Sequence, residues 1–497
     1  MGEIIPINII TEKRGFVYMK KAKIFTIFCT FLLLFSAFST NLTGYAAFSP
    51  SFDLYSEGVF MVNLDTDIVV ASKNPDKKVY PASTAKIMTC LVALENVKNF
   101  NETVECPYDC YNEFSWVDEY YNPNFVGASN AAIEPLQENI TYQDCMYALM
   151  LRSGCEAANI IAYNVGGGSM EKFVDMMNET ARKIGCQNTH FSNAHGLFEE
   201  DNYTTAYDMY LIARYAIDKY PGFMKICGTY EYDMPANYNN PDGYTIVSTN
   251  RMMSVDSEYY DHGVKGIKTG SIDEYVLFRN GEWDEANPIE GFCSLVTYCE
   301  RDGYKYLLVT LQAPYYDHEG DYGETHFQDH KKLYEWAYSE FELKQVIGKN
   351  QQVMKVDVEM GKNTDEVGIV TTDEYFTLIP KSLDSTAIQQ ITPTVEPFRA
   401  PVSKGEPVGE LVLKLNGETL TTIPLETEYD VALDSIAKYK DRLKTVLGSP
   451  GVIASFVILA VMIIAFAVSK TITKRILANQ RDMQRRRKIQ MAPRSKK

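Results

Sequence analysis

The spacing of hydrophobic and polar residues along the chain changes at about residue 342. Before this point, stretches with apolar residues three or four apart mix with strand-like runs. After it, apolar and charged residues alternate one by one from Met354 to Met360, which is typical of a half-buried strand. Apolar runs also flank Asn416-Gly417, a dipeptide favoured in two-residue turns, and so predict a hairpin. The pattern predicts a mixed α/β unit over 47–342 and a β-rich unit over 343–429.

A longer apolar run lies before these units. Ile24–Phe38 contains no charge, follows a short lysine cluster at 20–23 and precedes small residues at Ala46 and Ala47. This order is typical of a secretory signal peptide. We therefore expect a leader over 1–46, with Met19 as its start; an uncleaved anchor is the alternative.

A second long apolar run lies near the other end of the chain. Gly451–Val468 has no charged side chain and approaches the length that a membrane-spanning helix needs. We expect a spanning helix, a polar helical stalk before it and a basic tail after it, at 448–469, 430–447 and 470–497. The tail carries eleven Lys or Arg residues against the single acid Asp482, which predicts a cytoplasmic C-terminus. The buried helix of a soluble core is the alternative.

Length, composition and charge narrow the class of protein. A chain of 497 residues is too long for one ordinary core, and 45% hydrophobic with 23% charged residues indicates a folded protein. The net charge is −17 even with the basic tail included, so the body between the two apolar runs is strongly acidic. An acidic body repels phosphate backbones, and we expect no nucleic acid partner.

The cysteines do not predict a disulfide framework or a metal site. The chain has ten, of which Cys29 lies in the leader, and an odd number remains. None of their spacings is that of a zinc site, so we expect no metal. Cys106 and Cys110 are close enough in sequence to pair, but buried free thiols are the favoured interpretation.

The strongest local chemistry lies at the start of a predicted helix. Pro81 precedes Ser83 and Lys86, and apolar residues at helical spacing follow. Residues three apart share a helix face, so these two side chains are expected to be neighbours. A lysine partly removed from water favours its neutral form, which can act as a base toward a serine hydroxyl. Alone, Ser-x-x-Lys is also common on ordinary surface helices, where the serine caps the helix.

Two further motifs support a catalytic interpretation. Lys268-Thr269-Gly270 is one, and Ser153-Gly154-Cys155, at the start of another apolar-periodic stretch, is the other. Together with Ser83 and Lys86 they form a set of the type used by β-lactamases and penicillin-binding proteins.

With these motifs the sequence resembles the low-molecular-mass D-alanyl-D-alanine carboxypeptidases, which are penicillin-binding proteins. Asn193-Ala194-His195-Gly196-Leu197 and Ala400-Pro401-Val402 are similar to further stretches of that family, and the likeness runs from about residue 50 to 430. It implies an α/β (α+β) DD-peptidase domain with a central antiparallel sheet and a helical subdomain, then an all-β domain and one transmembrane helix.

The resemblance also implies roles for individual residues. Ser83 is expected to attack the penultimate D-alanine carbonyl of a peptidoglycan stem peptide, while Lys86 accepts its proton. Ser153 would relay that proton to the leaving amine. The expected contacts to substrate come from Lys268, Thr269, Gly270, Ser271 and Cys155, with the backbone N–H groups of Ser83 and Ser271 as the oxyanion hole. The family needs no cofactor, and β-lactams inhibit it.

Three departures from the family pattern leave alternatives open. Cys155 replaces the usual Asn, and a thiol is a weaker donor than a carboxamide. Its use as a second nucleophile is disfavoured because no histidine motif adjoins it. Ala194 replaces the usual Pro before His195. We interpret His195 itself as a structural residue and not as a catalyst. Residues 272–290, which include Trp283, Asp284 and Glu285, lengthen the turn after Lys-Thr-Gly and either reshape the cleft rim or form neutral surface.

The sequence therefore predicts an enzyme that trims stem pentapeptides at the plasma membrane, with its catalytic domain outside the cell. A wall-binding scaffold with weakened turnover is the alternative that Cys155 suggests. A β-lactamase is disfavoured by the β-rich unit and by Ser153-Gly154-Cys155 in place of Ser-Asp-Asn.

Overall fold

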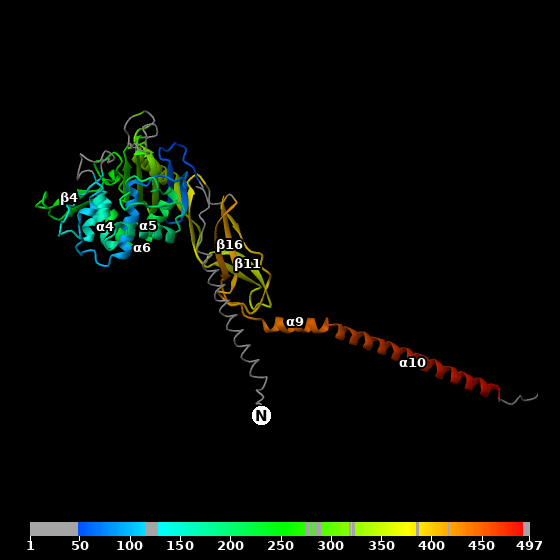
Figure 1. Cartoon of the computed structure of the whole chain (residues 1–497). Coiled ribbons are helices and arrows are strands. Elements are labelled where there is room, and N and C mark those ends of the chain that lie inside the picture. Colours follow the sequence, from blue (N-terminus) through cyan, green and yellow to red (C-terminus); the bar gives the residue numbers. More distant parts are fainter. Residues whose placement is uncertain are drawn as a thin grey trace, which may run out of the picture. The chain divides into compact units, whose positions relative to one another are not determined.

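The computed structural model describes residues 48–114, 128–273, 278–279, 282–283, 290–317, 320, 324–383, 387–415 and 417–490 (Figure 1). The expected leader over 1–46 lies outside them, as does most of the turn after Lys-Thr-Gly, including Asp284 and Glu285. The chain divides into two compact units, Met1–Leu343 with Leu378–Lys381 and Lys344–Thr377 with Ser382–Lys497.

A five-stranded antiparallel sheet forms the centre of the first unit. Its order is β2-β1-β9-β8-β5, with bounds β1 Gly58–Asn63, β2 Ile68–Lys73, β5 Lys268–Ile272, β8 Phe292–Arg301 and β9 Tyr304–Pro314. Alternate residues of β9 enter different cores: Leu307, Val309 and Leu311 pack on one face, and Tyr306 and Leu308 on the other. Because both faces are covered, β8 and β9 are apolar along most of their length instead of alternating with polar residues.

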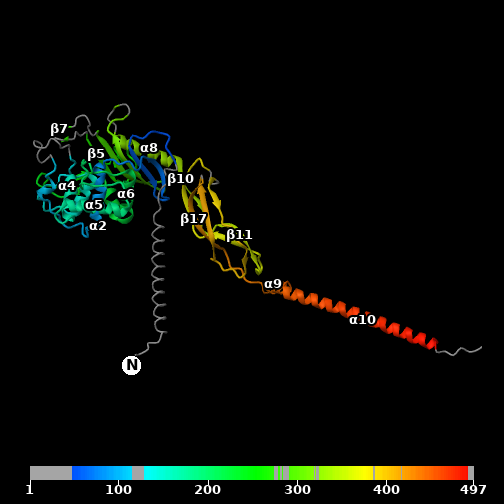
Figure 2. The same cartoon turned by 45° about the vertical axis from the view of Figure 1, so that its right-hand side comes forward.

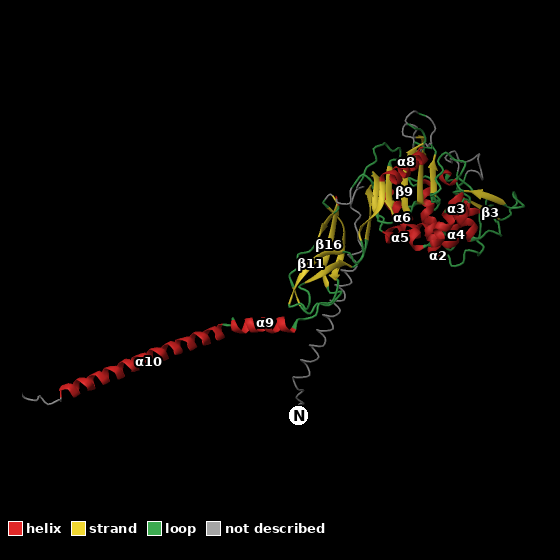
Figure 3. Cartoon of the chain, turned by 180° about the vertical axis from the view of Figure 1, so that it is seen from behind, coloured by secondary structure: helices red, strands yellow, loops and turns green. Residues whose placement is uncertain are grey.

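Helices cover both faces of this sheet. One face carries α2 (Lys86–Asn96), α3 (Tyr142–Leu151), α4 (Cys155–Val165), α5 (Met170–Ile184), α6 (Ala206–Lys219) and α7 (Pro221–Cys227). Figure 3 shows α2 to α6 gathered in one cluster. The other face carries α8 (Thr325–Glu340), which lies apart from that cluster (Figure 2). Helix α2 is buried from Lys86 to Ala93, so its first turn is held by packing on every side.

Short elements connect this framework. They are the 3-10 turns η1 (Ala82–Ala85), η2 (Tyr108–Cys110) and η4 (Arg251–Met253), and the hairpins β3–β4 (Glu231–Met234, Tyr244–Val247) and β6–β7 (Phe278–Arg279, Glu282–Trp283). The N-cap of α3 is a capping box in which Thr141 and Asp144 each accept the other's backbone N–H.

The second unit is built on a six-stranded sheet of order β14-β16-β17-β12-β11-β15. Its strands are β11 (Gln352–Glu359), β12 (Glu366–Thr371), β14 (Gln389–Ile391), β15 (Phe398–Arg399), β16 (Pro407–Leu415) and β17 (Glu418–Thr427). A separate pair is formed by β10 (Phe341–Ile347) and β13 (Tyr375–Pro380), and each of these strands belongs partly to the first unit and partly to the second. The predicted alternation in β11 is confirmed, since Val356 and Val358 are buried between exposed charged residues. The predicted hairpin is also confirmed: Leu415 pairs with Glu418, and Gly417 has a φ of 89°.

Two helices follow the second sheet. Helix α9 (Ser435–Leu447) occupies the stretch predicted as a stalk, and two residues separate it from α10 (Pro450–Gln490). An 18-residue window of α10 has a mean hydropathy of 2.9, which makes this helix long and apolar enough to cross a membrane. The helix continues beyond the predicted span into the basic tail.

The cysteines of the described residues are all buried and unpaired. This confirms their interpretation as small hydrophobic residues, and Cys106 and Cys110 do not pair with each other. Among those same residues, no group of three or more His, Cys, Asp or Glu side chains is arranged to hold a metal ion.

Candidate active site

The first turn of α2 brings Ser83 and Lys86 together, as the sequence predicts. Pro81 precedes the 3-10 turn η1 and accepts a hydrogen bond from the Thr84 hydroxyl at 2.5 Å, which fixes the turn. Ser83 lies in η1, Lys86 is the first residue of α2, and Nζ of Lys86 lies 2.9 Å from Oγ of Ser83. Ser83 is 7% exposed and Lys86 is fully buried, so the hydroxyl reaches the surface while the amine lies behind it.

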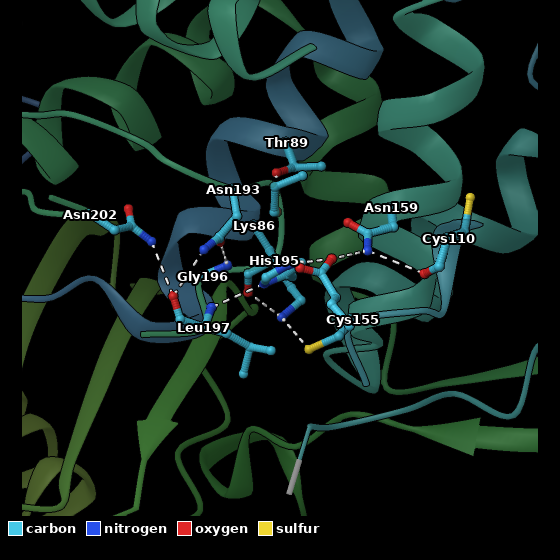
Figure 4. Close-up of polar contacts among 12 residues, drawn as sticks. Lys86, Thr89, Cys110, Cys155, Asn159, Asn193, His195, Gly196, Leu197 and Asn202 are labelled. Carbon is cyan, nitrogen blue, oxygen red and sulfur yellow. Dashed lines mark hydrogen bonds and ion pairs between the residues drawn. The ribbon is translucent and has the colours of Figure 1, made fainter. Parts of the chain in front are cut away.

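Three oxygen or sulfur atoms surround the Lys86 amine, of which Figure 4 shows those of His195 and Cys155. Besides Ser83 Oγ, these are the backbone oxygen of His195 at 2.6 Å and Sγ of Cys155 at 3.5 Å. Burial lowers the pKa of Lys86, and the neighbouring Cys155 opposes this only if its thiol is ionised. Because burial raises the pKa of the Cys155 thiol, that thiol stays neutral, and the effect of burial on Lys86 dominates.

Ser153 reaches the site from the junction between α3 and α4. Helix α3 ends at Leu151 and α4 begins at Cys155, so the two helices leave Ser153 in a short connection. Its φ of 65° lies in the left-handed region, which is uncommon for a residue with a side chain and often found at functional sites. The side chain is 5% exposed and lines the same cleft as Ser83.

The edge strand β5 closes the other side of the site. Gly270 lies so close to η1 that a Cβ atom on it would be 3.1 Å from the backbone nitrogens of Ser83 and Thr84. Lys268 is 1% exposed, and its amine donates to the backbone oxygen of Thr269 at 2.9 Å. Burial, and then the charge of Lys86, hold the pKa of Lys268 well below its ordinary value.

A cleft with a volume of about 570 Å³ joins these elements. Five of the predicted residues line it: Ser83, Ser153, Thr269, Gly270 and Ser271. Lys86, Lys268 and Cys155 lie behind its wall, each at most 1% exposed. The sequence predicts Cys155 as a substrate contact, and in the structure its thiol hydrogen-bonds the Lys86 amine and the backbone oxygen of Ser153.

The cleft also contains charged and polar residues that sequence reasoning missed. Arg152, Arg251, Glu324 and His326 line it, and Arg251 forms an ion pair with Glu324. Thr249 shares a hydrogen bond of 2.5 Å with the hydroxyl of Thr269. Apart from Arg152, next to the second motif, these residues belong to none of the recognised motifs, and only the folded chain brings them to the cleft.

The contacts of His195 fit the structural interpretation made from the sequence, which stays a prediction. Its Nδ1 accepts the backbone N–H of Leu197 at 3.1 Å, so the ring proton is on Nε2, which lies 3.0 Å from the carboxylate of Glu113. The ring is thereby fixed, and the His195 carbonyl is held against Lys86 (Figure 4). The carbonyl of Ala194, at the position where Pro is usual, accepts a hydrogen bond from Thr89 at 2.5 Å.

Comparisons with known proteins find relatives of both units. A family model described as D-alanyl-D-alanine carboxypeptidase matches residues 45–275, and a model described as penicillin-binding protein 5, C-terminal domain, matches residues 341–432. The D-alanyl-D-alanine carboxypeptidase DacF of Bacillus subtilis is 28% identical over 76% of this chain and 86% of its own length. DacA of Escherichia coli strain K12 is 24% identical over 82% of this chain and 91% of its own length.

Solved structures show the same fold. Penicillin-binding protein 6B from Escherichia coli has a TM-score of 0.54 at 21% identity, covering 78% of this chain and 99% of its own. Penicillin-binding protein 5 from Haemophilus influenzae has a TM-score of 0.52 at 19% identity, covering 77% and 99%. These likenesses confirm the predicted fold class, with its α/β domain followed by a β-rich domain.

Proposed function

The chain belongs to the D-alanyl-D-alanine carboxypeptidase family of serine peptidases, and from this premise we propose that it removes the terminal D-alanine of peptidoglycan stem pentapeptides through an acyl-enzyme on Ser83. The observation that carries the proposal is the buried Lys86 amine, which lies 2.9 Å from Ser83 Oγ behind the wall of the cleft that Ser83 lines. The proposed chemistry uses side chains and backbone groups of this chain, together with water.

Acylation begins with the Ser83 hydroxyl. Its oxygen attacks the carbonyl carbon of the penultimate D-alanine, and its proton passes to the neutral amine of Lys86. Burial favours that neutral amine, and the His195 carbonyl holds it in place. The C–O bond to Ser83 forms as the carbonyl π bond opens, which gives a tetrahedral oxyanion.

The oxyanion is stabilised by backbone N–H groups, and the leaving group by a proton. Ser83 and Ser271, whose amides we assign to this role, both line the cleft, and the close approach at Gly270 brings β5 next to η1. The scissile C–N bond then breaks while a proton reaches the leaving amine through Ser153. D-alanine leaves, and water hydrolyses the ester to regenerate Ser83.

The terminal carboxylate of the substrate binds at the β5 side of the cleft. Thr269 supplies a hydroxyl in the lining, and Lys268 lies directly behind it with a cationic form that a bound carboxylate would favour. β-lactams carry a carboxylate and an acylating carbonyl in a similar relation, and we propose that they acylate Ser83 in the same way.

We also propose the membrane topology expected from the sequence. Helix α10 would span the plasma membrane once, with the catalytic unit on the cell-wall side and the C-terminus in the cytoplasm. The basic residues after the apolar window support this direction, since positive charge is retained on the cytoplasmic side.

Labelling with a fluorescent penicillin, combined with D-alanine release from a pentapeptide, tests the proposal. The wild type should be labelled and should release D-alanine, and Ser83→Ala should do neither. Labelling without release would favour the weakened wall scaffold, and rapid penicillin breakdown a β-lactamase. Persistent labelling of Ser83→Ala would show that another residue is the nucleophile.

A further inference from the structure

Two residues in the first turn of α4 form hydrogen bonds to the backbone of a segment of the cleft wall. The backbone N–H of Cys155 donates to the backbone oxygen of Ser129 at 2.8 Å. One carboxylate oxygen of Glu156 accepts the backbone N–H of Ala131 at 2.6 Å and that of Ile133 at 3.4 Å. Residues 129–133 are therefore held through their backbone by two successive residues of one helix.

Gly154 allows α4 to approach this segment closely. A Cβ atom at this position would lie 3.1 Å from Cβ of Ala131 and 3.1 Å from Oε2 of Glu156, which is tighter than ordinary contacts. The four residues from Ser153 to Glu156 thus all contribute to the cleft. Ser153 points into the cleft, and the next three bring the segment at 129–133 against it.

The residues directly before these amides line the proposed substrate cleft. Ala128, Ser129 and Asn130 line the same cleft as Ser83 and Ser153, directly before the two amides that Glu156 binds. A displacement of these amides would move Ser129 and Asn130 relative to the nucleophile. Displacements of about 1 Å are enough to change substrate handling strongly.

Glu156 is an unusual residue for this place. It is fully buried, and burial raises its pKa to about 7 while the hydrogen bonds from Ala131 and Ile133 and the charge of Lys86 act in the opposite direction. An apolar side chain would fill the space without the cost of removing a carboxyl group from water. What the carboxylate provides, and an apolar side chain could not, is an acceptor for the backbone N–H groups of the cleft wall.

We propose that Glu156 is a positioning residue for the reaction, which holds the cleft-lining residues 128–130 in place by binding the amides of Ala131 and Ile133. This inference rests on the proposed carboxypeptidase function. It predicts that the segment contributes to binding the stem peptide and that its position depends on an acceptor oxygen at residue 156, not on the negative charge.

Two substitutions at residue 156 and one control separate positioning from folding. Glu156→Ala removes the acceptor, and Glu156→Gln keeps an oxygen for the Ala131 amide. The control is Asp208→Ala: Asp208 is 2% exposed and accepts the Asn188 amide and the Thr189 hydroxyl, both at 2.7 Å, but lies away from the cleft. Each full-length variant is titrated with penicillin, so that kcat refers to acylatable enzyme.

The expected results differ between the variants. Glu156→Ala should raise KM for a pentapeptide about tenfold or more, since the wall is displaced. Glu156→Gln should stay within about threefold of the wild type, because the amide oxygen replaces the lost acceptor. Asp208→Ala should lower the melting temperature and leave KM unchanged, because partial unfolding reduces the number of active molecules and not their affinity.

Amide hydrogen exchange gives a readout that does not depend on turnover. Exchange at Ala131 and Ile133 should accelerate in Glu156→Ala and stay slow in Glu156→Gln. A wild-type KM in Glu156→Ala, or unchanged exchange at these amides, would overturn the positioning role, as would a Gln variant as impaired as the Ala variant. Failure of the wild type itself to release D-alanine would instead count against the proposed function.

Discussion

Each of the two units has a strand that carries a lysine, and the two lysines have opposite environments. Lys268 of β5 is 1% exposed, and burial holds its pKa well below the ordinary value. Lys355 of β11 is exposed in an ion pair with Glu366, which raises its pKa. In β11 the lysine keeps its charge in water, which avoids the cost of burying it. In β5 the lysine is buried despite this cost, and such buried titratable groups are common at functional sites. The usual rule that charged side chains are exposed therefore holds for Lys355 in the β-rich unit and not for Lys268 in the catalytic unit.

The largest expected effect comes from removing Lys86, which we propose as the base for the nucleophile Ser83. Lys86→Ala should lower the rate of acylation by penicillin about 1,000-fold, within the range of general base catalysis, because no other described side chain lies within hydrogen-bond distance of Ser83 Oγ. Stopped-flow measurement of the acylation rate checks this. A decrease of less than tenfold would mean that another group accepts the proton.

The two strand lysines give a matched pair of substitutions. Lys268→Met should lower kcat/KM for a pentapeptide about 100-fold, through loss of the carboxylate contact. The same change should raise the free energy of unfolding by about 1 kcal/mol, because a buried amine is replaced by an apolar side chain. Lys355→Met should leave kcat/KM unchanged. Kinetics and urea unfolding test the pair, and the comparison fails if both variants lose activity equally.

Two glycines extend the comparison to the backbone. Gly270→Ala places a methyl group 3.1 Å from the nitrogens of Ser83 and Thr84, so acylation should slow about tenfold. Gly417→Ala meets no neighbour within 4 Å but must keep a φ of 89°, so it should cost about 1 kcal/mol of stability without slowing acylation. Unfolding curves and acylation rates together distinguish a steric effect at the site from backbone strain at a turn.

The smallest expected effect concerns the departure from the family motif. Cys155→Asn should raise turnover about threefold, because a carboxamide hydrogen-bonds more strongly than the buried thiol beside Lys86. Separate acylation and deacylation rates for the two proteins show which step changes. Turnover below that of the wild type would mean that the site has adapted to the thiol.

The sequence could predict features that depend on local pattern. The alternation in β11, the hairpin at Gly417 and the neighbouring Ser83 and Lys86 all follow from residues within a few positions of one another. Features that depend on distant contacts could not be predicted. The carbonyl of His195 lies 109 positions from Lys86 in the sequence, and Glu324 meets Arg251 only in the folded chain.

Glu156 lies between these two cases. It follows the second motif directly and is visible in the sequence, but an acidic residue early in a helix has an ordinary explanation in the helix dipole. Only the folded structure shows that it is buried and binds the amides of a segment more than twenty positions away.

The pH dependence of Ser83 acylation tests the central claim most directly. Only the neutral amine of Lys86 accepts the serine proton, so the rate should rise with pH through the pKa of this lysine. Since burial lowers that pKa, the rise should occur at a lower pH than the one at which an exposed lysine loses its proton. Mass spectrometry of the adduct should place the penicilloyl group on Ser83 throughout. A rate that rises only in the range of an exposed lysine, or an adduct on another residue, would contradict the account.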